Sequence, residues 1–307
     1  MSGHGHSHGP SISAGGAHRG KLLVVLGITG VVLVAEVIGS VITGSLALLA
    51  DAGHMLTDFV GITLAVLAVT FAARAASPTR TFGLYRLEIL AALANAVLLF
   101  AVGIYILYEA WQRWSSPPEV EGGLMLAFAF VGLVANLVGL MILRSGSKES
   151  LNVRGAYLEV LGDLLGSVAV IAAAVVIALT GWQRADVVAS VLVALMILPR
   201  AWSLLRETLD VLLESTPRDV DLAEVRRHMC ETPGVIDVHD LHAWTITSGI
   251  PVLSAHVVVA DDALADGGGA RVLDQLADCL HDHFDVEHST FQLEPATHSD
   301  HEFHTHD

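Results

Sequence analysis

The stretch SLALLADAGHMLTDFVGI, residues 45–62, places His54 and Asp58 four residues apart in a run that is otherwise almost entirely apolar. A run of this kind is typical of a membrane-spanning helix, which needs about 20 apolar residues. On a helix, residues four apart lie on one face, so the imidazole and the carboxylate are predicted to point the same way. A charged group in lipid costs about 2.5 kcal/mol or more, which indicates that these two residues have a function.

The composition of the chain indicates a membrane protein with an acidic, water-soluble end. Its 307 residues are 53% hydrophobic and 16% charged, and the mean hydropathy is +0.61. The net charge of −16 is concentrated in residues 213–307, which carry 19 acids against 4 Lys or Arg. Nucleic acid is excluded as a partner because phosphate binding needs clustered basic residues. The acidic balance suits cations, and no organic cofactor is expected.

Six apolar stretches of about 20 residues are predicted to cross the lipid bilayer. Lys and Arg, with Arg200 among them, gather in flanks on one side, and cytoplasmic flanks carry such an excess. Both termini are therefore predicted to be cytoplasmic, in a multi-pass protein of the inner (plasma) membrane. Residues 1–20 lack the apolar core of a removable signal peptide, so the first span is expected to be retained. The predicted spans are residues 22–42, 45–72, 84–111, 122–143, 155–179 and 185–205.

A second polar pair, Glu159 and Asp163, repeats the four-residue spacing in the fifth stretch. With His54 and Asp58 it supplies one imidazole and three carboxylates, enough for a four-coordinate divalent metal if the two helices face each other. Matching polar pairs in two spans also point to a site near the middle of the membrane. The alternative is that each pair makes an unrelated hydrogen-bond contact between helices.

Glycines and further polar residues accompany the two pairs. Gly61 and Gly166 each follow the second residue of a pair by three positions and are predicted to let the helices pack closely. Asp51, three residues before His54, is interpreted either as an outer-shell acceptor for its imidazole N–H or as a residue lining the entrance to the site. Glu36 either lines an aqueous path or makes a buried hydrogen bond.

Four segments resemble the cation diffusion facilitator family, in particular its bacterial zinc transporters of the cobalt-zinc-cadmium efflux type. They are residues 45–62, TRTFGLYRLEILAALANAVLLF (79–100), GAYLEVLGDLLGSVAVI (155–171) and VHDLHAW (238–244). The resemblance implies a homodimer of six-helix protomers, each with a cytoplasmic C-terminal domain. It also implies export of a divalent metal in exchange for protons by alternating access.

The family's transport site maps onto His54, Asp58, Glu159 and Asp163, with Zn²⁺ as the expected substrate. Many zinc members have a histidine where this chain has Glu159. A harder oxygen in place of nitrogen is expected to relax discrimination against Cd²⁺, Co²⁺ or Mn²⁺, which leaves a broader efflux transporter as the alternative.

Proton coupling has a physical basis in the ligands themselves. Metal ligands must be deprotonated, so metal and protons compete for the same atoms, and histidine titrates near physiological pH. A metal sensor or a passive channel is a further possibility. An intramembrane metalloenzyme is the remote alternative, since it needs an open coordination position and a general base, and an HExxH motif is absent.

Residues 213–295 are predicted to form a small α+β domain of order αββαβ, which resembles the metallochaperone-like domain of the family. Thr216 is expected to cap its first helix, with Pro217 in the first helical position. Strands are expected at residues 235–246, 250–260 and 288–294, and a second helix at 269–284. The two cysteines, Cys230 and Cys279, are interpreted as reduced thiols.

Several histidines make this domain a second candidate for metal binding, in a regulatory role, with a purely dimerising role as the alternative. By the resemblance, His239 and His256 match positions that bind metal at the dimer interface in relatives. Glu294 and Gln292 stand where relatives have other residues, and His242 and His288 are further candidates. Residues 1–20 and 296–307 are His-rich tails predicted to be disordered, and residues 21–212 form the predicted transport domain.

Overall fold

The computed structural model describes residues 12–72, 77–144, 151–247, 249–284, 286 and 288–299. The chain divides into two compact units. One comprises Met1–Leu64 with Ala94–Leu204, and the other comprises Ala65–Leu93 with Leu205–Asp307.

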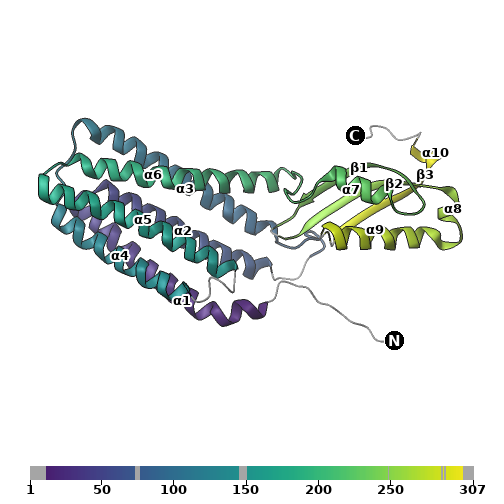
Figure 1. The fold of residues 1–307 in the computed structure, drawn as a ribbon, viewed down its shortest axis with the longest axis horizontal. Helices are drawn as coiled ribbons and strands as arrows, with labels where there is room; N and C mark the ends of the chain where they lie inside the picture. The colour runs from purple at the N-terminus through teal and green to yellow at the C-terminus, as the bar shows by residue number, and fades with distance from the viewer. Residues whose placement is uncertain are drawn as a thin grey trace. The chain divides into compact units, whose positions relative to one another are not determined.

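Long α-helices dominate the N-terminal two thirds of the described chain (Figure 1). Apart from α2, each contains a stretch long and apolar enough to cross a membrane among the described residues. The second predicted span falls on α2, where the side chains of residues 65–72 lie outside the description. The predicted helical membrane domain is confirmed. The helices are α1 (Ile12–Thr43), α2 (Leu46–Ala72), α3 (Arg86–Ser115), α4 (Gly122–Arg144), α5 (Leu151–Thr180) and α6 (Arg184–Leu212).

Two helices extend into segments predicted to be disordered. α1 begins at Ile12, so residues 12–20 of the predicted N-terminal tail are helical, while residues 1–11 lie outside the description. A short helix, α10 (Ala296–Ser299), likewise occupies the start of the predicted C-terminal tail.

Small side chains let the membrane helices approach one another. In lipid the hydrophobic effect does not drive helices together, so close packing at small residues does. α4 packs against α1 and α5, and a Cβ added to Gly39 of α1 would lie 2.6 Å from Cγ of Phe128 on α4. Alanines from four helices line one of the buried clusters, namely Ala47, Ala129, Ala173, Ala174, Ala185 and Ala189.

A carboxylate from α6 holds the start of α2. Asp186, only 1% exposed, accepts hydrogen bonds from Ser45 Oγ at 2.6 Å, Leu46 N at 2.8 Å and Ala47 N at 3.1 Å. The first N–H groups of a helix have no partner within the helix, and a negative charge there is favourable. Asp186 therefore fixes the helix that carries His54 and Asp58.

The C-terminal domain, which lies within the second unit, contains a three-stranded mixed sheet in the order β1-β2-β3. β1 (Val235–Thr245) is antiparallel to β2 (Pro251–Val259), which is parallel to β3 (His288–Pro295). The helices α7 (Leu222–Cys230) and α9 (Gly268–Phe284) pack on the sheet in one core, with α8 (Asp261–Leu264) and a short 3₁₀ turn before α9. The predicted α+β domain is confirmed. Its core includes Val225, Met229, Val238, Leu253, Val257, Leu276 and Leu280.

The first helix of this domain starts later than predicted. α7 is capped by Asp221, whose side chain accepts from the backbone N–H groups of Ala223 and Glu224. Thr216 instead precedes a turn that begins at Pro217, whose carbonyl oxygen accepts from Val220 N at 3.0 Å. An aspartate two residues before a donor N–H is an equally good cap, and the apolar stripe begins only at Leu222.

Both cysteines are free thiols in the C-terminal domain. Cys230 ends α7 and Cys279 lies in α9. Burial raises the pKa of the Cys230 thiol, and the nearby Asp237 carboxylate raises it further. Cys230 is therefore held in its neutral, less nucleophilic form.

Candidate metal centre

α2 and α5 bring three of the predicted transport-site residues together. His54 Nε2 lies 3.3 Å from Asp163 Oδ1 and 3.8 Å from Asp58 Oδ2. One potential ligand atom from each residue falls within 4.8 Å of the others, and all three side chains are buried. One imidazole nitrogen and two carboxylate oxygens from facing helices are a donor set that suits Zn²⁺ and similar divalent metals.

The hydrogen bonds within this cluster are incomplete. His54 Nδ1, Asp58 Oδ2 and Asp163 Oδ1 are buried and have no hydrogen-bond partner among the described residues. Buried polar atoms are nearly always partnered, and their exceptions point to a role. Asp58 Oδ2 and Asp163 Oδ1 face His54 Nε2, so they lie where oxygen ligands of a shared metal ion would be needed.

The fourth predicted ligand, Glu159, has a different partner. Its carboxylate pairs with the guanidinium of Arg200, which belongs to α6, and it is not among the three clustered residues. Nη2 of Arg200 also lies 3.8 Å from Asp58 Oδ1. Sequence reasoning counted Arg200 only as a cytoplasmic flank residue. The signal that was available is its position inside the predicted span 185–205.

Asp51 faces α5 beside the cluster. Its Oδ2 accepts from Ser167 Oγ at 3.4 Å, and Ser167 Oγ in turn lies 3.3 Å from Asn136 Nδ2 on α4. The carboxyl group of Asp51 also lies within hydrogen-bonding reach of that of Glu36. Gly166 makes room for Asp51, since an added Cβ would lie 2.9 Å from its Oδ1. The metal role predicted for Asp51 stays a prediction.

Two neighbouring positions refine the sequence-based expectations. Gly61 allows the close approach of α3, because a Cβ there would lie 2.6 Å from Asn95 Nδ2. Glu36 is completely buried, and its carboxyl group lies within hydrogen-bonding reach of that of Asp51. Gly132 leaves it space, as an added Cβ would lie 2.5 Å from Glu36 Oε1.

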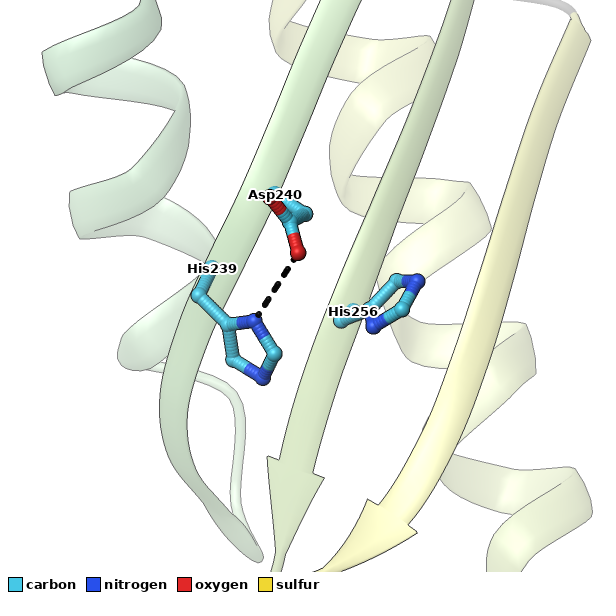
Figure 2. Close-up of side chains that lie close together, drawn as sticks. All are labelled: His239, Asp240 and His256. Atoms are coloured by element: carbon cyan, nitrogen blue, oxygen red, sulfur yellow. Dashed lines mark ion pairs between the residues drawn. The ribbon is translucent and has the colours of Figure 1, made fainter. Parts of the chain in front are cut away.

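A second cluster of potential ligands lies on the sheet of the C-terminal domain. Figure 2 shows His239 and Asp240 on β1 beside His256 on β2, and one ligand atom from each falls within 4.8 Å of the others. His239 and His256 face each other because they are paired in the strand register. Asp240 was not predicted. It adopts a left-handed backbone with φ of 45° at an irregularity in β1, and this turns its carboxylate toward His239 Nδ1, 3.5 Å away.

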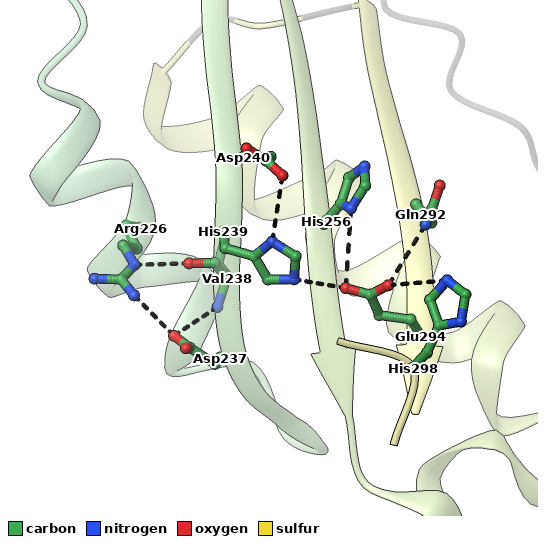
Figure 3. A network of polar contacts seen from close by, with 9 residues as sticks. All are labelled: Arg226, Asp237, Val238, His239, Asp240, His256, Gln292, Glu294 and His298. Carbon is green, nitrogen blue, oxygen red and sulfur yellow. Dashed lines mark hydrogen bonds and ion pairs between the residues drawn. The ribbon is translucent and has the colours of Figure 1, made fainter. Parts of the chain in front are cut away.

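Glu294, only 2% exposed, organises the other side of this cluster (Figure 3). Its Oε1 lies 2.6 Å from His239 Nε2 and 3.9 Å from His256 Nδ1. Its Oε2 lies 3.7 Å from His298 Nε2 and accepts from Gln292 Nε2 at 3.4 Å. A carboxylate on the far ring nitrogen of a histidine is the usual orienting partner of a metal ligand.

The structure separates the two remaining histidine candidates from this cluster. His242 lines a hollow of about 290 Å³ together with Asp240 and His256, but is not among the clustered ligands. His288 begins β3 and pairs with Val252, whereas Glu294 pairs with Val258 at the other end of the strand.

A buried His–Asp–Asp cluster between membrane helices, joined to a small α+β domain, is the architecture of a membrane transporter for metal cations. Residues 22–213 match the sequence profile of the cation efflux transmembrane domain, and residues 217–296 match that of the cation efflux protein cytoplasmic domain. The chain belongs to the cation efflux family, the cation diffusion facilitators.

Three relatives illustrate the similarity. The metal cation efflux system protein CzcD of Cupriavidus metallidurans is 51% identical over 96% of this chain and 90% of its own length. The zinc transporter ZitB of Escherichia coli is 45% identical over 95% of this chain and 92% of its own. The cadmium, cobalt and zinc/H(+)-K(+) antiporter of Bacillus subtilis is 41% identical over 96% and 93%, respectively. The prediction of a transporter, not an enzyme, is confirmed by the family and these relatives.

Proposed function

We propose that this metal cation efflux protein exports Zn²⁺ from the cytoplasm in exchange for protons, by alternating access at His54, Asp58, Glu159 and Asp163. The observation that carries the proposal is the buried cluster of His54, Asp58 and Asp163, whose ligand atoms converge between α2 and α5. The names of the relatives, a zinc transporter and an antiporter that involves protons, support the substrate and the counter-ion.

Proton exchange follows from the chemistry of these ligands. Imidazole and carboxylates bind a metal only when deprotonated, so binding the ion releases protons and protonation releases the ion. If the site opens alternately to each side, metal leaves where protons bind. We further propose a homodimer in the inner membrane with both termini in the cytoplasm, supported by the match to the family's cytoplasmic domain and by the distribution of Lys and Arg.

Reconstitution into liposomes that contain a zinc indicator and a pH indicator tests this function. We expect zinc and proton fluxes in opposite directions, with zinc accumulation driven by an imposed pH gradient. Zinc flux that runs only down its own gradient, with no change in internal pH, would identify a channel and overturn the proposal. Parallel assays with Cd²⁺, Co²⁺ and Mn²⁺ define the range of substrates.

A broader metal range is the second candidate, and Glu159 is the observation that favours it. Its oxygen offers a harder ligand than the histidine of many zinc members, and the Bacillus subtilis relative is named for cadmium, cobalt and zinc. We expect Glu159→His to raise the ratio of Zn²⁺ to Mn²⁺ transport severalfold, measured by competition in the liposome assay. Glu207→His, at an exposed position on α6, is the control. An unchanged ratio in Glu159→His would contradict this role.

The cytoplasmic cluster is proposed to bind a regulatory metal ion. Two imidazoles and a carboxylate suit Zn²⁺, and Glu294 would orient His239 through the 2.6 Å contact with Nε2. In a full-length Asp163→Asn background, the double substitution of His239 and His256 by alanine is expected to remove one bound Zn²⁺ per chain, counted by equilibrium dialysis. His288→Ala, at the other end of β3, should leave the count unchanged. An equal loss in both variants would speak against the cluster.

A further inference from the structure

Arg200 supplies a fixed positive charge at the edge of the transport site. Its guanidinium pairs with Glu159, and Nη2 lies 3.8 Å from Asp58 Oδ1. Its charge also acts on Asp163 and on His54. Arg200 is the contribution of α6 to a group of ionisable side chains that otherwise belongs to α2 and α5.

The two carboxylates that Arg200 contacts are also proposed metal ligands. Asp58 stands between two partners, with Oδ1 toward Arg200 and Oδ2 at 3.8 Å from His54 Nε2. Glu159 is held by Arg200 and is the one predicted ligand outside the converging cluster. Arg200 therefore occupies the Glu159 carboxylate, which lies within hydrogen-bonding reach of Asp58.

Arginine cannot share a ligand role with a metal ion. The guanidinium stays protonated in proteins and has no acceptor lone pair, so it interacts with carboxylates only as a cation. A carboxylate oxygen that faces a guanidinium is thus in competition with an incoming dication. Repulsion between the two cations adds to this competition.

The side chain of Arg200 has room to leave the carboxylates. It is 46% exposed, whereas its partner Asp58 is only 8% exposed. Pro199 immediately precedes it inside α6 and cannot donate a backbone hydrogen bond, which interrupts the ladder of the helix at this point. A long, half-exposed side chain beside such a break can change position without disrupting the buried core.

We propose that Arg200 is a tethered counter-cation of the transport site, which neutralises Glu159 and Asp58 in the metal-free protein and is displaced from them when the metal ion binds. This inference rests on the proposed function, because it assumes that those two carboxylates are ligands. Arg200 would thereby lower the affinity of the site and favour release of the ion. It would also compensate the additional negative charge that Glu159 brings in place of a histidine.

The test is Zn²⁺ binding by the purified full-length protein, titrated against a competing zinc indicator. Zn²⁺ binding at the transport site is defined as the binding that the wild type shows and the Asp163→Asn variant lacks. Suppose that Arg200 pairs with the carboxylates in about 90% of the metal-free molecules, so that only about 10% can bind Zn²⁺. Removing the Arg200 charge then tightens binding about tenfold, because the apparent affinity is proportional to the fraction of molecules able to bind. We expect this tightening in Arg200→Gln and in Arg200→Met, either of which suffices if the other fails to fold. Arg200→Lys, which keeps the charge, should remain near the wild-type affinity.

Controls separate the possible results. Arg206→Gln removes an exposed arginine from the same helix and should leave affinity unchanged. In a Glu159→Gln background the effect of Arg200→Gln should shrink, because coupled residues are not additive. Unchanged or weaker binding in the Arg200 variants, with binding still lost in Asp163→Asn, would overturn the counter-cation and leave the transport site intact. Binding that survives Asp163→Asn would instead overturn the site itself.

Discussion

Replacing Asp163 by asparagine is expected to lower Zn²⁺ transport by more than about 100-fold, since even outer-shell substitutions at metal sites cost about 10- to 100-fold. Asp163 Oδ1 is 3.3 Å from His54 Nε2 and has no hydrogen-bond partner in the described chain. The substitution removes a charged ligand and substitutes a neutral amide of nearly equal size, so the packing of α5 is preserved.

The measurement is the initial rate of zinc uptake into liposomes at several zinc concentrations. Asp210→Asn is the matched control, because Asp210 is a 39% exposed carboxylate on α6 that pairs with Arg218. Asp58→Asn should be as damaging as Asp163→Asn. Wild-type rates in both site variants, with correctly folded protein, would rule out the His54, Asp58 and Asp163 cluster as the transport site.

Asp186→Ala is expected to destabilise the protein by about 2–4 kcal/mol, given the usual cost of losing a helix cap and of leaving buried donors without partners. The substitution removes the acceptor for Ser45 Oγ, Leu46 N and Ala47 N at the start of α2. Because α2 carries His54 and Asp58, transport should fall together with stability.

Thermal unfolding of the purified protein in detergent gives the stability, and the liposome assay gives the transport rate. Asp186→Asn keeps one acceptor oxygen and should lie between the wild type and Asp186→Ala. Asp219→Ala, at an exposed position, is expected to change neither quantity. An unfolding temperature of Asp186→Ala that matches that of Asp219→Ala would show that the cap is dispensable.

Local periodicity was sufficient to predict the helices and to place His54 and Asp58 on one helix face. Long apolar runs can bury their backbone polar groups in lipid only as helices, so the spans were visible in composition alone. The four-residue spacing placed His54 with Asp58, since neighbours on one helix follow from geometry. No comparable spacing rule in the sequence predicts which residues of two different helices will touch. The approach of α5 to Asp51 at Gly166 and of α3 to Gly61 depends on three-dimensional packing.

The limits of sequence reasoning are clearest at Arg200 and Asp240. An arginine near the end of a span is usually a flank residue, and nothing local says that its guanidinium reaches Glu159 on another helix. Asp240 joins the cytoplasmic cluster through a left-handed residue that breaks the regular alternation of β1. Strict alternation would have placed its side chain on the opposite face from His239.

The location of the two cysteines has a practical consequence for following the transport cycle. Cys230 and Cys279 both lie in the C-terminal domain, so the membrane helices carry no native sulfhydryl. Single cysteines introduced along α2 would therefore be the only thiols in the membrane helices available for labelling. Membrane-impermeant maleimides applied to one side of the membrane or the other would then show from which side each introduced cysteine is accessible, with and without zinc.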